Sequence, residues 1–123
     1  MKLSSVRLVT DDVVVLAAFY EQLTGVTPAG FAEYMELQTP AATLAICSQR
    51  SVEAADAGAL TAAANRTAVL EFEVEDVDVE RARLGSVVTD WVMEPTDRQW
   101  GNRSMLFRDP DRNLVNVYSP ARR

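Results

Sequence analysis

The chain contains no histidine among its 123 residues, and this absence removes several kinds of chemistry. Histidine is the side chain that most readily gains or loses a proton near neutral pH, and its imidazole is the commonest metal ligand. A histidine-dependent enzyme and a conventional metalloenzyme are therefore excluded. The sequence is better suited to a small binding protein.

Cysteine and long hydrophobic runs are also scarce. The single cysteine, Cys47, cannot form an intrachain disulfide and suits a reducing compartment, so we expect a buried structural thiol. No apolar run approaches the roughly 20 residues that span a bilayer, and the first residues lack the pattern of a signal peptide. We expect a cytoplasmic protein that does not bind membranes.

Positive charge is in short supply. Lysine and arginine number 12 against 18 aspartates and glutamates, which gives a net charge of −6. Binding a phosphate backbone requires a basic face, so nucleic acid is not an expected partner. A negative surface favours cationic ligands, although mild acidity also keeps many proteins soluble.

What the chain does contain is a weak internal repeat. Residues 5–12 align with residues 69–76, and each segment has the pattern of a strand that runs into an aspartate, Asp12 or Asp76. Over 70–75 hydrophobic residues alternate with glutamates, which is typical of a strand with one buried face. The two aspartates stand where helix N-caps belong.

Each half is predicted to continue as a helix followed by strands. Hydrophobic residues at helical spacing over 16–23 predict a helix that begins after Asp12 and ends at Gly25. A second, shorter helix is predicted at 77–84, with Gly85 as its stop. The predicted strands lie at 31–37 and 42–47 in the first half, and at 87–93, 103–107 and 114–118 in the second.

The size and composition fit a single globular domain. Hydrophobic residues make up 48% of the sequence, and 123 residues suffice for one sizeable core. We expect this domain to consist of two modules, residues 1–48 and 67–123. They would be joined by the alanine-rich linker 49–66, which is expected to contain a short helix.

Five segments carry a family pattern in their order and spacing: VRLVTDD at 6–12, FYEQLTG at 19–25, FEVEDVD at 72–78, WGNR at 100–103 and FRDPDRN at 107–113. Together they resemble the vicinal oxygen chelate superfamily of glyoxalases, extradiol dioxygenases and bleomycin resistance proteins, and most closely its metal-free binding branch. The resemblance implies an α+β fold in which two βαβββ modules form a cup-shaped mixed sheet, and a homodimer. Arg112 stands where the family usually has glycine, so we expect mild backbone strain there.

Metal-dependent members of that family hold the ion with residues on the first and last strands of each module, facing into the cup. The resemblance maps the usual histidines onto Ser5 and Val69, and the usual glutamates onto Ala45 and Asn116. Iron and glyoxalase-like sites require convergent nitrogen and carboxylate donors, which these positions do not supply. We therefore expect no metal and no other cofactor.

Glu71 and Glu73 are two residues apart on one strand, so their side chains point the same way. Two carboxylates are too few for a hard cation, which generally takes six or more oxygens. We expect them to contact a ligand. The alternative is a solvated face, or an ion pair with Arg7, which aligns with Glu71 in the repeat.

Strand alternation turns a set of mixed polarity toward the cup, and aromatic and thioether side chains nearby could stack on a flat ligand. Core packing is the alternative for each of these apolar residues. Trp100 is favoured because it lies in a polar loop before Gly101, and Trp91 is a second choice. The predicted ligand-binding residues are Ser5, Arg7, Tyr34, Glu71, Glu73, Trp91, Trp100, Met105, Asn116 and Tyr118.

The leading hypothesis for function is a binding protein that sequesters a small aromatic or cationic drug-like molecule without metal, as the bleomycin resistance resemblance implies. The competing hypothesis is a metal-free isomerase or lyase of the same fold that uses Glu71 or Glu73 as general base. A module that binds a partner protein is a third alternative. Fold alone does not decide between these classes.

Overall fold

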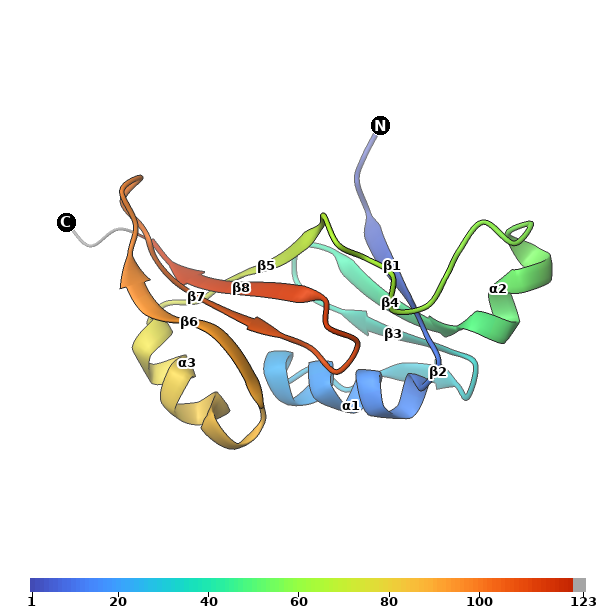
Figure 1. The fold of residues 1–123 in the computed structure, drawn as a ribbon, viewed down its shortest axis with the longest axis horizontal. Coiled ribbons are helices and arrows are strands. Elements are labelled where there is room, and N and C mark those ends of the chain that lie inside the picture. Colours follow the sequence, from blue (N-terminus) through green and yellow to red (C-terminus); the bar gives the residue numbers. More distant parts are fainter. Residues whose placement is uncertain (121–123) are drawn as a thin grey trace. The chain divides into compact units, whose positions relative to one another are not determined.

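The computed structural model describes residues 1–120, apart from the side chain of Ala54, and divides into two compact units (Figure 1). Unit 1 comprises Met1–Ala64 and unit 2 comprises Asn65–Arg123. The boundary falls near the end of the predicted linker 49–66, so most of that segment belongs to unit 1. None of the helices within residues 1–120 has the length and apolar character to cross a membrane.

Unit 1 contains one four-stranded sheet and two helices. The sheet order is β1-β4-β3-β2, in which β1 runs parallel to β4 and the other neighbours are antiparallel. The elements are β1 (Ser5–Thr10), α1 (Val13–Thr24), β2 (Ala29–Phe31), β3 (Tyr34–Gln38), β4 (Thr43–Ser48) and α2 (Gln49–Ala55).

Unit 2 repeats this arrangement. Its sheet order is β5-β8-β7-β6, again with the first strand parallel to its neighbour and the others antiparallel. The elements are β5 (Val69–Glu73), α3 (Val77–Arg83), a 3-10 turn η1 (Leu84–Ser86), β6 (Asp90–Asp97), β7 (Arg103–Arg108) and β8 (Leu114–Ser119). The predicted α+β class with two βαβββ modules is confirmed, and each module has its own mixed sheet.

Two predicted strands are corrected by the structure. The strand expected at 31–37 is a hairpin, because β2 ends at Phe31 and reverses into β3 at Tyr34. Gly30 makes this tight pairing possible, since a Cβ there would lie 2.2 Å from the Tyr34 carbonyl oxygen. The strand expected at 87–93 starts later, at Asp90, because the chain first forms η1.

The predicted helix starts and the end of α1 agree closely with the structure, whereas Gly85, the predicted stop of the second helix, lies within η1 and Leu84 caps α3. The Asp12 carboxylate accepts a hydrogen bond from the Val15 amide at 3.1 Å, and the Asp76 carboxylate caps α3 in the same way. Gly25 ends α1 with a left-handed φ of 74°. The apolar stripe of α1 is buried in unit 1 and consists of Val13, Leu16, Ala17, Phe19, Tyr20 and Leu23.

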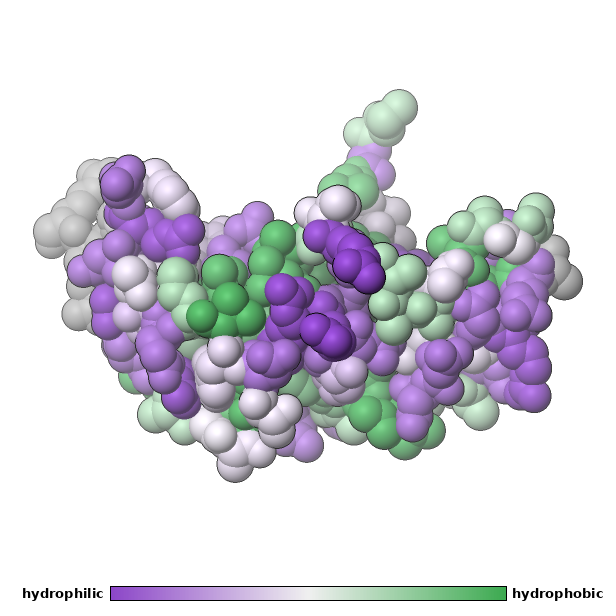
Figure 2. Space-filling model, in the orientation of Figure 1, coloured by the Kyte–Doolittle hydropathy of each residue, from purple (hydrophilic) through white to green (hydrophobic). Residues whose placement is uncertain are grey.

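In unit 2, α3 packs on one face of the sheet, beside β6 (Figure 1). Ion pairs fix it there, because Arg81 binds Glu94 of β6 and Arg103 of β7 binds Asp78. We call this side the α3 face. Its buried strand residues include Met105, Phe107, Val115 and Val117, all at 0–1% exposure. Figure 2 shows that hydrophilic residues cover much of the visible surface of the molecule, with hydrophobic ones in separate patches.

The turn between β7 and β8 carries the expected strain. Arg112 has a left-handed φ of 67°, and its position is held by Asp109, whose carboxylate accepts hydrogen bonds from the Asp111 and Asn113 amides at 2.8 and 2.9 Å. A residue with a Cβ at positive φ costs about 1–2 kcal/mol, and glycine avoids this at the expense of chain entropy.

We expect Arg112→Gly to raise the free energy of unfolding by about 0.5–1 kcal/mol, because the left-handed strain exceeds the entropy that glycine adds to the unfolded chain. Urea denaturation measures the change. Arg112→Ala is the matched control, since it removes the same side chain but keeps the strained Cβ. Equal stability of the two variants would show that the strain contributes nothing.

Candidate ligand-binding site

The sheet face of unit 2 that lies opposite α3 brings several predicted residues together. Registry across the strands places Glu71 beside Asn116, Leu106 and Met93 in one row, and Glu73 beside Tyr118, Ser104 and Thr96 in the next. Side chains at paired positions share a face. We call this surface the glutamate face. It consists of Glu71, Glu73, Met93, Thr96, Ser104, Leu106, Asn116 and Tyr118.

The two carboxylates of the glutamate face are exposed. The Asn116 amide donates a hydrogen bond to Glu71 Oε2 at 2.8 Å, which orients that carboxylate. Within the part of the chain that the structure describes, neither Glu71 nor Glu73 forms an ion pair with a cationic side chain. Tyr118, in register with Glu73, is half-buried and supplies an aromatic surface beside the charge.

Arg98, a residue that the sequence analysis did not predict for the site, contacts both the Trp100 ring and residues of the glutamate face. The turn between β6 and β7 closes when the Arg98 amide donates to the Asn102 carbonyl at 2.8 Å, and Trp100 at its tip is 69% exposed. The Arg98 guanidinium lies 4.5 Å from the centre of the Trp100 ring. It also reaches the Met93 sulfur and the Ser104 hydroxyl at 3.2 and 3.4 Å.

Two predicted ligand-binding residues, Trp91 and Met105, lie on the other side of the sheet. Met105 pairs with Val117 on the α3 face and is fully buried. The Trp91 ring packs edge-on against Phe107 at 5.4 Å and is covered by Arg81 of α3 at 3.8 Å. The structure therefore does not bring these two residues onto the glutamate face, and both pack within unit 2.

The remaining predicted residues, Ser5, Arg7 and Tyr34, belong to unit 1. Arg7 forms an ion pair with Asp56 at 3.0 Å, whereas Glu71 was one partner expected from the repeat. The Tyr34 hydroxyl donates to Glu36 at 2.9 Å, and this bond raises the pKa of Tyr34. Ser5 is exposed. Arg7 and Tyr34 are therefore engaged with other polar side chains of unit 1.

Cys47 is buried as expected, at 1% exposure. Burial raises the pKa of its thiol above the ordinary value, although Arg7 nearby acts in the opposite direction. A thiol held in its protonated form is a poor nucleophile. The structural role predicted from the sequence fits this environment.

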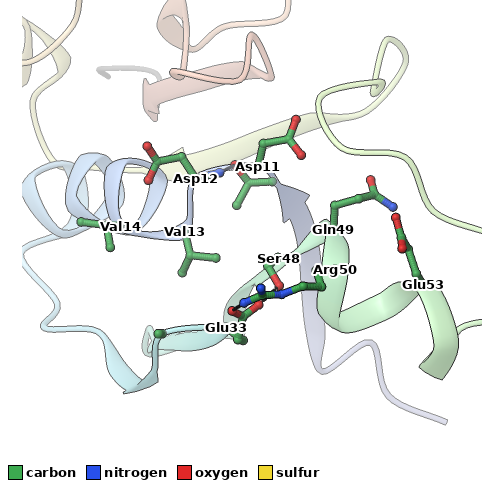
Figure 3. Close-up of a pocket in the computed structure, with 11 residues that line it drawn as sticks. Asp11, Asp12, Val13, Val14, Glu33, Ser48, Gln49, Arg50 and Glu53 are labelled. Atoms are coloured by element: carbon green, nitrogen blue, oxygen red, sulfur yellow. Dashed lines mark hydrogen bonds and ion pairs between the residues drawn. The ribbon is translucent and has the colours of Figure 1, made fainter.

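A pocket of about 460 Å³ lies in unit 1, where β1 and β4 meet the starts of α1 and α2. Figure 3 shows Glu33, Ser48 and Arg50 together at its centre. The Glu33 carboxylate accepts hydrogen bonds from the Ser48 hydroxyl and the Arg50 guanidinium, which lower its pKa. Because these groups are engaged with one another, the glutamate face is the stronger candidate site.

Residues 2–117 match the family model described as the glyoxalase/bleomycin resistance protein/dioxygenase superfamily. The chain belongs to this superfamily. A relative in sequence is "Uncharacterized protein YraH" of Bacillus subtilis (strain 168). It is 29% identical over 125 residues, which cover 96% of this chain and 98% of YraH.

Several solved structures are similar to this chain in fold. A glyoxalase/bleomycin resistance protein/dioxygenase family enzyme from Burkholderia phytofirmans PsJN gives a TM-score of 0.85 at 20% identity, covering 98% of this chain and 99% of that one. A lactoylglutathione lyase from Agrobacterium tumefaciens gives 0.75 at 20% identity, covering 96% and 92%. A protein of unknown function from Agrobacterium tumefaciens str. C58 gives 0.82 at 24% identity, covering 97% and 94%.

The four positions onto which the resemblance maps the superfamily's metal ligands carry side chains that are poor donors to a metal ion. Ser5 and Val69 open β1 and β5, the buried Ala45 lies in β4, and Asn116 is engaged with Glu71. A methyl and an isopropyl group donate nothing, and a hydroxyl and an amide are weak donors beside imidazole and carboxylate. Over residues 1–120, no group of three or more cysteine, aspartate or glutamate side chains is placed to hold a metal ion.

Proposed function

We propose that this superfamily member binds and sequesters a small aromatic cation on the glutamate face of unit 2, without a metal ion. The observation that carries the proposal is the pair of exposed carboxylates, Glu71 and Glu73, that have no cationic partner among residues 1–120. Tyr118 beside them offers a ring face on which a flat ligand could stack.

Charge and stacking favour the same ligand class. A cation over an aromatic ring gains about 0.5–2 kcal/mol, depending on how far it is desolvated. The net charge of −6 adds a long-range attraction for cations. The superfamily's description includes bleomycin resistance proteins, which agrees with a role in holding a toxic small molecule.

We expect acridine orange, a flat aromatic cation, to raise the melting temperature and to bind with a Kd on the order of 10 µM. Fluorescein, a flat aromatic anion of similar size, is the control and should not bind. Raising NaCl from about 0.05 M to about 0.5 M should lower the affinity for acridine orange several-fold, because salt screens exposed charges. Equal binding of both dyes, or no stabilisation by any aromatic cation, would contradict the proposal.

A metal-free enzyme is the second candidate, favoured by one contact. The Asn116 amide fixes Glu71 through Oε2, which leaves Oε1 available to accept a proton from a substrate. Glu71→Gln separates the two functions when a turned-over compound is in hand: loss of turnover with binding retained indicates a general base. Loss of binding of a cation that is not turned over indicates the binding protein.

A further inference from the structure

Arg98 is a half-buried cation on the glutamate face whose guanidinium has no carboxylate partner among residues 1–120. Its guanidinium contacts the Trp100 ring, the Met93 sulfur and the Ser104 hydroxyl. The two arginines of β7 differ from it, since Arg103 binds two aspartates and Arg108 donates to the Arg112 carbonyl. Arg98 therefore retains donors for an anion.

The position of Arg98 relative to the glutamates follows from the strand order. Its guanidinium lies against Ser104 of β7, which is in register with Tyr118 of β8, and Tyr118 is in register with Glu73 of β5. Neighbouring strands are about 4.8 Å apart, so the cationic and anionic sides are separated by about 10 Å. Tyr118 stands on the strand between them.

We propose that the ligand of this face is amphoteric: a flat aromatic molecule with an anionic group bound by Arg98 at one end and a cationic group near Glu71 and Glu73 at the other. This inference rests on the proposed function and names its ligand class. The planar guanidinium suits a carboxylate, because it can donate two parallel hydrogen bonds to its two oxygens. The exposed Trp100 ring, stacked on the same guanidinium, holds that donor in place and adds ring surface.

The alternative ligand classes fit the surface less well. A simple cation leaves Arg98 unpaired and close enough to repel it, whereas a simple anion meets the same difficulty at the two glutamates. An opposite charge at each end of the ligand satisfies both sides, and specificity follows because a molecule that lacks either group leaves a protein charge without a partner.

The test compares norfloxacin with norfloxacin ethyl ester, binding each to the purified chain and following ligand fluorescence. Norfloxacin carries a carboxylate and a piperazinium at opposite ends of one flat ring system, and the ester keeps only the cation. We expect the unmodified protein to bind norfloxacin at least about fivefold more tightly than the ester. Arg98→Gln should lower the affinity for norfloxacin about tenfold, and it should leave the affinity for the ester unchanged or slightly higher.

Two further variants keep the result interpretable. Arg98→Lys retains charge but not the planar fork, so it should recover part of the norfloxacin affinity. Arg66→Gln removes the same charge from an exposed residue before β5 and should not change the affinity for either ligand. Equal affinity of the two ligands for the unmodified protein, or equal weakening of both by Arg98→Gln, overturns this inference while leaving cation binding intact. If neither ligand binds, the proposed function fails and the inference with it.

Discussion

Replacing Phe107 with alanine should lower the free energy of unfolding by about 3–5 kcal/mol, the largest stability effect that we expect in unit 2. The Phe107 ring is fully buried on the α3 face and packs edge-on against Trp91 at 5.4 Å. The cost combines the lost transfer of a large apolar side chain from water, the cavity left behind and the lost ring contact. Chemical denaturation followed by circular dichroism measures it.

The control for this change is Phe31→Ala, which truncates the same residue type at 64% exposure and should cost less than about 1 kcal/mol. Natural domains are stable by only about 5–15 kcal/mol, so Phe107→Leu provides a milder variant if the alanine variant does not fold. It should destabilise by an intermediate amount. Similar stabilities for the variants at Phe107 and Phe31 would contradict the assignment of the α3 face as the core of unit 2.

The double variant Glu71→Gln/Glu73→Gln should bind acridine orange about tenfold more weakly, or weaker still, than the unmodified protein. An exposed ion pair contributes up to about 1 kcal/mol, and two carboxylates acting on one ligand cation approach twice that. Glutamine keeps the size and polarity of each side chain, and the Asn116 amide can still donate to the amide oxygen at position 71. Fluorescence titration at low salt gives the change in Kd.

The matched control is Glu21→Gln/Glu53→Gln, which removes two exposed carboxylates from helices of unit 1 and changes the net charge equally. If binding depended on net charge alone, both double variants would weaken the dye to the same degree. We expect the control to retain nearly all of its affinity. A loss as large as that of the Glu71/Glu73 variant would move the site away from the glutamate face.

The sequence predicted the modules because local signals agreed with one another along the chain. Aspartates at 12 and 76 cap the helices, glycine at 25 ends α1, and the alternation over 70–75 fixes the face of β5. That Glu71 and Glu73 share a face, as do Asn116 and Tyr118, was predicted in the same way, since residues two apart on a strand point to the same side. Their grouping on one surface needed only the parallel pairing of β5 with β8.

Local pattern could not decide which face of the sheet a residue occupies where that depends on the registry between strands. Alternation places Met105 and Phe107 on one face of β7, but which face depends on the turn that joins β7 to β8 and pairs Met105 with Val117. The face that Trp91 occupies is set in the same way, because Trp91 pairs with Phe107 of β7. Arg98 was missed because a charged residue in a polar turn is normally solvated, and its contact with Ser104 appears only once the turn is closed.

Amide chemical shifts of the ¹⁵N-labelled chain, followed during titration with acridine orange, would show whether the ligand lies on the glutamate face. We expect the largest shifts on amides of residues 71–73, 98–106 and 116–118. Shifts concentrated on residues of α3, or on residues 10–14 and 48–53 around the pocket of unit 1, would contradict it.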